Sequence, residues 1–299
     1  MRIAVLMSTY NGEAFLRQQI DSILSQEGNF ELDLWVRDDG STDGTAQILR
    51  EYEAAGKLQW YTGDNLKPAH SFWDLLLHCR DYDFYSFADQ DDFWMQGKLQ
   101  SAVQSITDEI GPAVACANAR LVGPDLVSLG RNVYLTPPPT DLETMSIAGG
   151  ILGCTMVINR ALAELLQSRE APDVMVMHDF YIALVCRLAG GKLCFDMTPQ
   201  MLYRQHGNNV VGASQNKAAA LKDRIRTVTK RAKVSVYDQA KSLIKQYPDL
   251  GTREQRKWLE KLSSPTLGNR MAIACTRKTH YPSKNKAITL RLAMFLGNR

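Results

Sequence analysis

Residues 86–94, SFADQDDFW, carry the densest group of chemically useful side chains in the sequence. Asp89, Asp91 and Asp92 place three carboxylates within four residues, and such charges repel one another unless a cation lies among them. Asp89 and Asp91 are one residue apart, so an extended strand directs both to one side. Mg²⁺ binds through one or two carboxylates together with substrate phosphates. The pattern indicates a metal–diphosphate site, with a solvated acidic turn as the alternative.

Two further polar clusters follow apolar, strand-like runs: residues 8–12 (STYNG) and residues 38–41 (DDGS). In an open parallel sheet, ligands bind beyond the carboxyl ends of the strands. If the three strands are neighbours, the three clusters share one crevice. The second cluster also resembles the start of a calcium loop, but Arg50 stands where that loop needs Glu, which excludes it. Asp43 is expected to cap the next helix.

Strands and helices alternate along the first 110 residues. The apolar patterns predict strands at 2–7, 32–36, 58–61 and 83–88, each followed by a helical pattern. Further strands are expected at 113–117, 154–159, 193–195 and 201–203, with a helix at 180–188. This alternation is typical of an α/β fold with a mostly parallel sheet flanked by helices.

Charge divides the chain near residues 212–217. Residues 217–299 contain 20 Lys or Arg and 5 Asp or Glu, whereas the preceding residues have a net charge of −12. We expect two domains, an acidic body at 1–215 and a basic α-helical region at 216–299. The six cysteines are scattered among apolar neighbours, which indicates reduced thiols. Neither a signal peptide nor a membrane-spanning run is expected.

These motifs, in this order, resemble glycosyltransferase family 2, whose members are inverting nucleotide-sugar transferases of GT-A fold. The resemblance covers about residues 1–212 and lies in VLMSTYNGEAFLRQQIDSIL, VRDDGSTDGT and FADQDDFW. The last motif looks like the family's DxD metal motif. The stretch GGILGCTMVINRAL resembles the segment where donor and acceptor sugars meet.

Carried over residue by residue, the resemblance implies a nucleotide-sugar site made of Ser8, Thr9, Tyr10, Asp38, Asp39, Asp89, Gln90 and Arg204. The first three would line the nucleoside pocket, and Asp39, alone or together with Asp38, would hydrogen-bond to the pyrimidine base. Asp89 would lie near the ribose. Arg204, with its neighbours Tyr203 and Asn208, would lie near the diphosphate.

The resemblance also implies a divalent cation, Mg²⁺ or Mn²⁺, bound by Asp91 on the diphosphate. His206 in YRQHGNNVVG is a candidate further ligand, since imidazole suits Mn²⁺-type sites. A plain turn residue is the alternative reading of this histidine.

The family's catalytic base usually belongs to an acidic pair at the start of a helix. The matching stretch here, MHDFYIALVCRLAGG, has His178 and Asp179 in place of that pair. We assign the base to Asp179. A carboxylate in the first turn of a helix is stabilised as an anion, so it stays ionised but is a weaker base. His178 is the alternative because histidine titrates near neutrality.

The narrower resemblance is to bacterial rhamnosyltransferases, carried by LRQQIDSIL, DQDDFW and YRQHGNNVVG. It implies transfer of L-rhamnose from dTDP-L-rhamnose to a saccharide acceptor, which would be attached to a polyprenyl lipid. The reaction would belong to the synthesis of cell-surface polysaccharide or O-antigen. A UDP-hexose or UDP-HexNAc transferase is the alternative within the family. A non-catalytic nucleotide-sugar-binding protein is the alternative of another class.

The basic region from residue 217 suits an anionic membrane surface, where each nearby Lys or Arg contributes about 1 kcal/mol. Residues 287–296 are apolar enough to lie at the interface. We therefore expect a cytoplasmic protein attached to the cytoplasmic face of the inner membrane. A helical bundle that only packs on the body is the alternative. A nucleic-acid partner is not expected, because aromatics are few and the acidic body would repel phosphates.

Overall fold

The computed structural model describes residues 1–206, 227–229, 234–281 and 283–298 of the 299-residue chain. These residues form two compact units. The first contains residues 1–135, 151–171 and 191–206, and the second contains residues 136–150, 172–190 and the described residues from 227 onward. The boundary expected between residues 215 and 216 lies outside the described residues. Two segments of the body thus group with the C-terminal helices.

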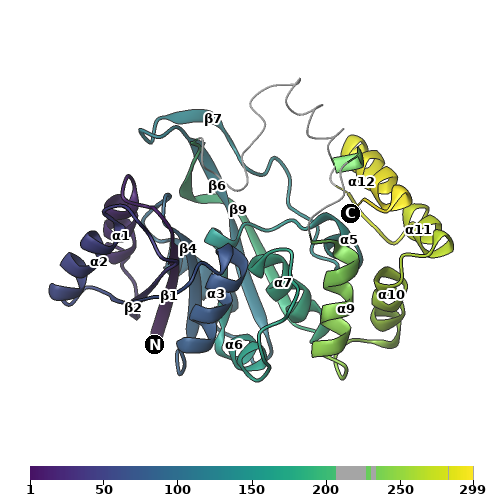
Figure 1. Ribbon diagram of the computed structural model, residues 1–299, viewed down its shortest axis with the longest axis horizontal. Helices are drawn as coiled ribbons and strands as arrows, with labels where there is room; N and C mark the ends of the chain where they lie inside the picture. The colour runs from purple at the N-terminus through teal and green to yellow at the C-terminus, as the bar shows by residue number, and fades with distance from the viewer. Residues whose placement is uncertain (207–226, 230–233, 282, 299) are drawn as a thin grey trace. The chain divides into compact units, whose positions relative to one another are not determined.

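A single sheet forms the centre of the first unit (Figure 1). Its strands are β1 (Arg2–Thr9), β2 (Glu31–Asp38), β3 (Gln59–Thr62), β4 (Phe84–Asp89), β5 (Phe93–Trp94), β6 (Ala113–Val122), β7 (Ser128–Asn132), β8 (Val157–Asn159) and β9 (Lys192–Arg204). The order is β3-β2-β1-β4-β8-β6-β9-β5, and β7 pairs with β6. The β3-β2-β1-β4 part is parallel throughout, as the sequence predicts.

Beyond β4 the sheet is mixed. β8 runs antiparallel to both β4 and β6, whereas β6 and β9 are parallel. The two short strands expected at 193–195 and 201–203 are one strand, β9. Its register against β6 shifts after Ala117, and this irregularity accommodates the polar residues and Pro199 between the two apolar stretches.

The helices of the first unit bury the apolar stripes that the sequence predicts. They are α1 (Leu16–Leu24), α2 (Thr45–Ala54), α3 (Lys67–His78), α4 (Lys98–Ile106) and α6 (Arg160–Gln167). In α1, for example, Leu16, Ile20 and Ile23 are fully buried. Figure 1 shows α3 and α6 side by side on the face of the sheet turned toward the viewer.

The core of this unit is the middle of β1. Residues 3–7 are fully buried, because both neighbouring strands are paired and helices cover the sheet. A continuous apolar run without alternation is what a strand buried on both faces requires. The strand expected at 154–159 is shorter, since a 3₁₀ turn, η1 (Gly153–Thr155), precedes β8.

The second unit is helical in its described residues. Its helices are α5 (Leu142–Ala148), α7 (His178–Leu188), α9 (Val236–Gln246), α10 (Arg253–Ser263), α11 (Leu267–Ala274) and α12 (Lys284–Leu296). The expected helical character of the C-terminal region is confirmed for α9 to α12. No helix among the described residues is both long enough and apolar enough to cross a bilayer.

Candidate active site

Strand register brings the three polar clusters to one edge of the sheet. Thr9 at the end of β1 is paired with Asp38 at the end of β2, and Ser8 is paired with Asp89 at the end of β4. The clusters therefore lie side by side, as expected for parallel neighbours. β1 lies between β2 and β4, so the STYNG residues separate the two acidic turns.

Gln90 connects the first cluster to the DQDD turn, residues 89–92. Its Oε1 accepts hydrogen bonds from Thr9 Oγ1 (2.5 Å) and from the Tyr10 backbone N–H (2.9 Å), and its Nε2 donates to the Tyr10 carbonyl (3.1 Å). Gly12 is packed so closely that a Cβ there would overlap Gln90 and Thr9. The predicted nucleotide-sugar residues Thr9, Tyr10 and Gln90 thus form one bonded group.

The DDGS turn, residues 38–41, has its charge compensated inside the protein. Asp38 accepts hydrogen bonds from the Ser41 backbone N–H (3.2 Å) and from Ser41 Oγ (2.5 Å). Asp39 forms an ion pair with Arg37, and both side chains are almost completely buried. Arg37 therefore explains why two acidic residues can follow a buried strand.

Sequence reasoning missed Arg37. Its guanidinium also donates to Asp74 (2.9 Å) and to the Asp64 carbonyl (3.0 Å). A further link joins Ser8 Oγ and Ser71 Oγ at 2.6 Å. A basic residue at the end of a buried strand, directly before two acids, is the signal that would have found it. The result is a network of hydrogen bonds between polar side chains beside Asp39.

The DQDD turn brings the two predicted metal ligands together. His206 Nε2 lies 2.7 Å from Asp91 Oδ2, although 115 residues separate them in sequence. Both side chains are partly exposed, at 15% and 18%. A carboxylate oxygen beside an imidazole nitrogen, both on partly exposed side chains, is a donor set that fits Mn²⁺ or Mg²⁺ with substrate oxygens completing the coordination.

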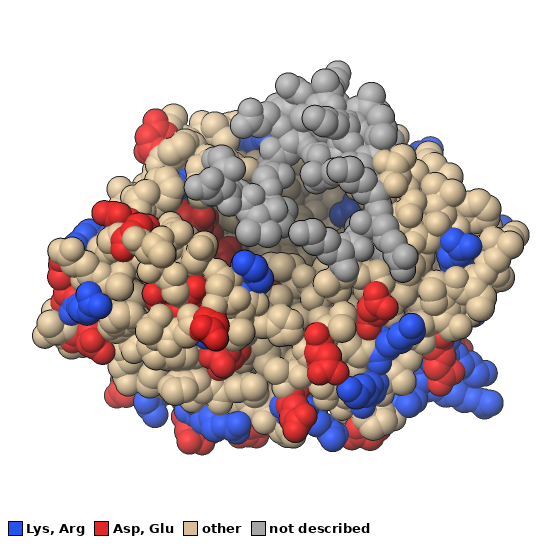
Figure 2. All heavy atoms as spheres, in the orientation of Figure 1, with Lys and Arg blue, Asp and Glu red and all other residues tan. Residues whose placement is uncertain are grey.

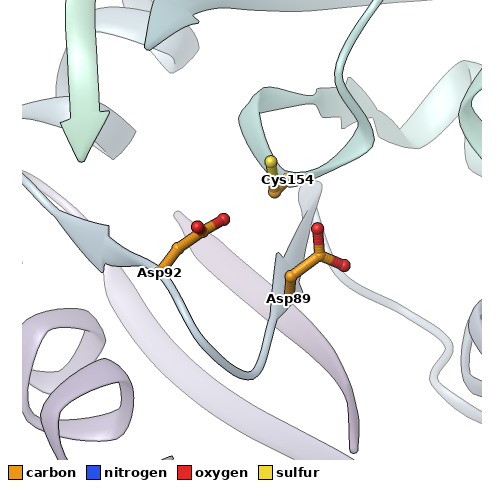
Figure 3. A group of neighbouring side chains, drawn as sticks. All are labelled: Asp89, Asp92 and Cys154. Atoms are coloured by element: carbon orange, nitrogen blue, oxygen red, sulfur yellow. The ribbon is translucent and has the colours of Figure 1, made fainter. Parts of the chain in front are cut away.

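A second group of possible ligands lies on the inner side of the same turn. Asp89, Asp92 and Cys154 have ligand atoms within 4.8 Å of one another and converge in Figure 3. Asp92 and Cys154 are buried, and burial raises the pKa of each well above its ordinary value. Metals bind the thiolate and carboxylate forms, which burial disfavours here, so this group fits a cation less well than Asp91 and His206.

Arg204 holds the DQDD turn from beneath. Its Nε donates to the Asp91 carbonyl (2.6 Å), and Nη2 donates to Gln18 (2.8 Å). Its backbone N–H donates to Asp92 Oδ1 (3.0 Å), and its guanidinium lies 4.4 Å from the centre of the Phe15 ring. These contacts favour a positioning role for Arg204. Asn208, named with it above, lies outside the described residues.

Lys98 lies buried under the turn and was not predicted as part of the site. Its Nζ is 3.6 Å from the centre of the Trp94 ring and 3.4 Å from Ser86 Oγ. Burial lowers the pKa of this amine to about 7. The aromatic residues Phe87 and Trp94 are fully buried, so the acidic turn lies on an apolar base.

Asp179 and His178 begin α7 in the second unit, which is described by itself. Asp179 lies in the first turn, and its Oδ1 accepts a hydrogen bond from the Phe180 backbone N–H (2.6 Å). His178 is buried, and burial lowers the pKa of its imidazole to about 3. The neutral form therefore persists at physiological pH, which removes the reason for preferring His178 as a group that titrates near neutrality.

The sequence is similar to one protein family and to individual glycosyltransferases. The sequence model of glycosyl transferase family 2 matches residues 4–166. The dTDP-rhamnosyl transferase RfbG of Shigella flexneri is 28% identical over 223 residues, which cover 70% of this chain and 74% of RfbG. The poly(ribitol-phosphate) β-N-acetylglucosaminyltransferase TarS of Staphylococcus aureus is 28% identical over 160 residues, 48% of this chain and 27% of TarS.

Solved structures show the same fold. The TarS 1–349 structure in complex with UDP-GlcNAc has a TM-score of 0.55 and 15% identity, covering 100% of this chain and 89% of that one. The mannosyltransferase PcManGT of Pyrobaculum calidifontis, in complex with GDP-Man and Mn²⁺, has a TM-score of 0.51 and 17% identity, with coverages of 97% and 73%. The expected GT-A fold is confirmed by these likenesses.

Proposed function

The chain belongs to glycosyl transferase family 2, and from this premise we propose that it transfers L-rhamnose from dTDP-L-rhamnose to a saccharide acceptor. The assignment of the donor rests on the similarity to the dTDP-rhamnosyl transferase RfbG, which extends over 70% of the chain. The proposed setting is synthesis of bacterial cell-surface polysaccharide or O-antigen, with a lipid-linked acceptor. Residues 1–215 form the proposed transferase domain and residues 216–299 its basic helical extension.

The proposed nucleotide-sugar site follows the edge of the sheet. Its members are Ser8, Thr9, Tyr10, Asp38, Asp39, Asp89, Gln90 and Arg204. The support is their convergence through strand register and through the hydrogen bonds of Gln90. Asp39 would accept a hydrogen bond from the base while Arg37 keeps it ionised. Arg204 would act by fixing the backbone of Asp91, through the bond to its carbonyl.

Asp91 and His206 would hold the divalent cation, Mg²⁺ or Mn²⁺, and their adjacency supports this role. When bound, the cation supplies charge stabilisation for the departing nucleoside diphosphate, worth roughly several kcal/mol. The apolar base under the turn and the contacts of Arg204 would keep the position of Asp91 fixed. This preorganisation matters because a misplaced ligand weakens the interaction with the diphosphate.

The proposed reaction is a single displacement with inversion. Asp179 would accept the proton of the acceptor hydroxyl as that oxygen forms its bond to the anomeric carbon. The bond between this carbon and the diphosphate oxygen breaks, and its electron pair leaves with the nucleotide. The position of Asp179 in the first turn of α7 supports an ionised carboxylate. The lowered pKa of His178 makes its imidazole a poor proton acceptor.

The test is a donor screen with purified protein. Binding and donor hydrolysis are measured for dTDP-rhamnose, UDP-glucose, UDP-galactose and UDP-GlcNAc, each with Mn²⁺, Mg²⁺ or EDTA. We expect a preference for dTDP-rhamnose that EDTA removes. Binding without hydrolysis or transfer, with every acceptor offered, would instead indicate a non-catalytic nucleotide-sugar-binding protein.

A second candidate function is transfer from a UDP-hexose or UDP-HexNAc donor. The 28% identity to TarS over 160 residues favours it, although that match covers less of the chain than the match to RfbG. In the donor screen, a preference for a UDP-sugar would keep the metal site and the family but replace the rhamnosyl assignment.

A further inference from the structure

The helices α11 and α12 pack against each other and expose an unusually apolar surface. Six large apolar side chains on them are at least 42% exposed: Leu267, Met271, Ile288, Leu292, Phe295 and Leu296. We call these six residues the α11–α12 ridge. Eight other large apolar side chains are exposed among the described residues, and they are distributed over the rest of the chain. The ridge is therefore a concentration rather than background exposure.

Helical spacing places the exposed ridge residues of α12 on one face of that helix. In α12, Ile288, Leu292 and Phe295 follow one another at intervals of four and three residues and so share a face. The opposite face contains Leu290 and Met294, which are buried. Among the described residues, α12 thus packs through its inner face, and the side chains of its outer face remain exposed.

Cations dominate the charge around the ridge. Residues 261–298 contain seven Lys or Arg and no Asp or Glu. Lys284 and Lys286 are exposed at the start of α12, whereas Lys278 is paired with Glu254 of α10 at 2.9 Å. In Figure 2 the right-hand surface, where Figure 1 draws α11 and α12, is tan with isolated blue side chains. Apolar side chains flanked mainly by cations are the combination that binds an interface of anionic lipids.

We propose that the α11–α12 ridge docks this protein on a membrane surface that carries anionic lipids. The apolar side chains enter the boundary between headgroups and acyl chains, while the flanking lysines and arginines contact lipid phosphates. A symmetric contact between two copies is disfavoured, because it would bring the exposed Lys284 and Lys286 of each copy together. The inference extends the proposed function, since a lipid-linked acceptor is presented at such a surface.

The test is co-sedimentation of the full chain with vesicles of phosphatidylglycerol and phosphatidylethanolamine, compared with phosphatidylcholine alone. We expect binding to the anionic vesicles only, weakened by salt. The triple variant Ile288→Asn, Leu292→Asn, Phe295→Asn should bind these vesicles at least roughly tenfold more weakly, because it removes apolar area from the ridge. The double variant Lys284→Gln, Lys286→Gln should bind about 25-fold more weakly, at about fivefold per cation.

Matched controls lie elsewhere on the chain. Val127→Asn with Leu129→Asn removes equally exposed apolar side chains, and Lys57→Gln with Arg80→Gln removes equally exposed cations. Both control pairs should bind vesicles like the wild type. If the triple variant does not fold, Leu292→Asn alone takes its place, with circular dichroism as the check.

Three outcomes would overturn the proposal. The first is wild-type vesicle binding by both the apolar triple variant and the lysine double variant. The second is an equal loss of vesicle binding in the control variants. The third is a dimer that forms without lipid and that the substitutions in the α11–α12 ridge dissociate. The last outcome, measured by analytical ultracentrifugation, would make the ridge a self-association surface. Metal-dependent donor hydrolysis in detergent-free buffer should be unchanged in the ridge variants. A failed donor screen with intact vesicle binding would therefore reject the proposed function and leave this inference standing.

Discussion

The two acidic turns at the sheet edge differ in how their charge is balanced. In the DDGS turn, buried Arg37 pairs with Asp39, and Ser41 donates twice to Asp38. In the DQDD turn, Asp91 Oδ2 lies 2.7 Å from His206 Nε2, and the Arg204 guanidinium donates to the Asp91 carbonyl rather than to its carboxylate. The two carboxylates of the first turn are buried against partners within the protein, whereas the Asp91 side chain of the second turn is 18% exposed.

This difference indicates that the two acidic turns bind different kinds of ligand, although their sequences are similar. A compensated carboxylate is suited to a fixed hydrogen bond with a neutral group, such as a nucleobase. A partly exposed carboxylate beside an imidazole nitrogen is suited to a cation from solution. The predictions below test this distinction, beginning with the largest effect.

Asp91→Asn should lower the transfer rate about 1,000-fold, because charge stabilisation through the cation is worth roughly several kcal/mol. The fold should persist, since Arg204 holds the turn through the Asp91 carbonyl, which the substitution keeps. Steady-state transfer and circular dichroism measure the two effects. Asp108→Asn, at an exposed carboxylate, is the control. A folded Asp91→Asn protein with near wild-type turnover would remove the metal from this turn.

Arg37→Met should destabilise the protein by about 3 kcal/mol, because Asp39 would stay buried without its partner. Thermal unfolding monitored by circular dichroism gives the change. The matched control is Arg17→Met, which breaks the exposed ion pair with Glu51 and should cost about 1 kcal/mol or less. Equal shifts for the two variants would contradict the view that the DDGS turn depends on internal compensation.

Mn²⁺ should raise the melting temperature of the wild type, since a cation at 100 times its dissociation constant adds about 2.7 kcal/mol to the stability of the folded form. The shift should disappear in Asp91→Asn and His206→Gln and persist in Cys154→Ser. Differential scanning fluorimetry with Mn²⁺ or EDTA measures it. Loss of the shift in Cys154→Ser alone would move the cation to the inner group of Asp89, Asp92 and Cys154.

Lys98 should make stability depend on pH. Its pKa is about 7 in the folded protein, against 10.5 for the ordinary amine, so the unfolded chain binds more protons between these values. Stability should therefore rise with pH, by up to about 1.4 kcal/mol per unit between pH 7 and 9, relative to Lys98→Met. Chemical unfolding at pH 7, 8 and 9 measures the slope. Lys57→Met should keep the wild-type slope, and a matching slope in Lys98→Met would refute the assignment.

Much of the first unit followed from local pattern. The unbroken apolar run of β1 and the helical spacing in α1 were readable because burial imposes its period on a short window of sequence. Placement of Ser8, Asp38 and Asp89 at strand ends was readable for the same reason. The single strand β9 was not, because a register shift against β6 carries polar residues that read as a break.

The sequence by itself determined the family motifs, the acidic strand ends and the one-signed charge of residues 261–298. Only the tertiary structure decided how charges pair over long separations. It placed His206 on Asp91 and Arg204 beneath the DQDD turn, and it buried Lys98, Asp92 and His178 so that their pKa values move away from ordinary values. The physical reason is that solvation and pairing depend on neighbours in space, which a local sequence pattern does not specify.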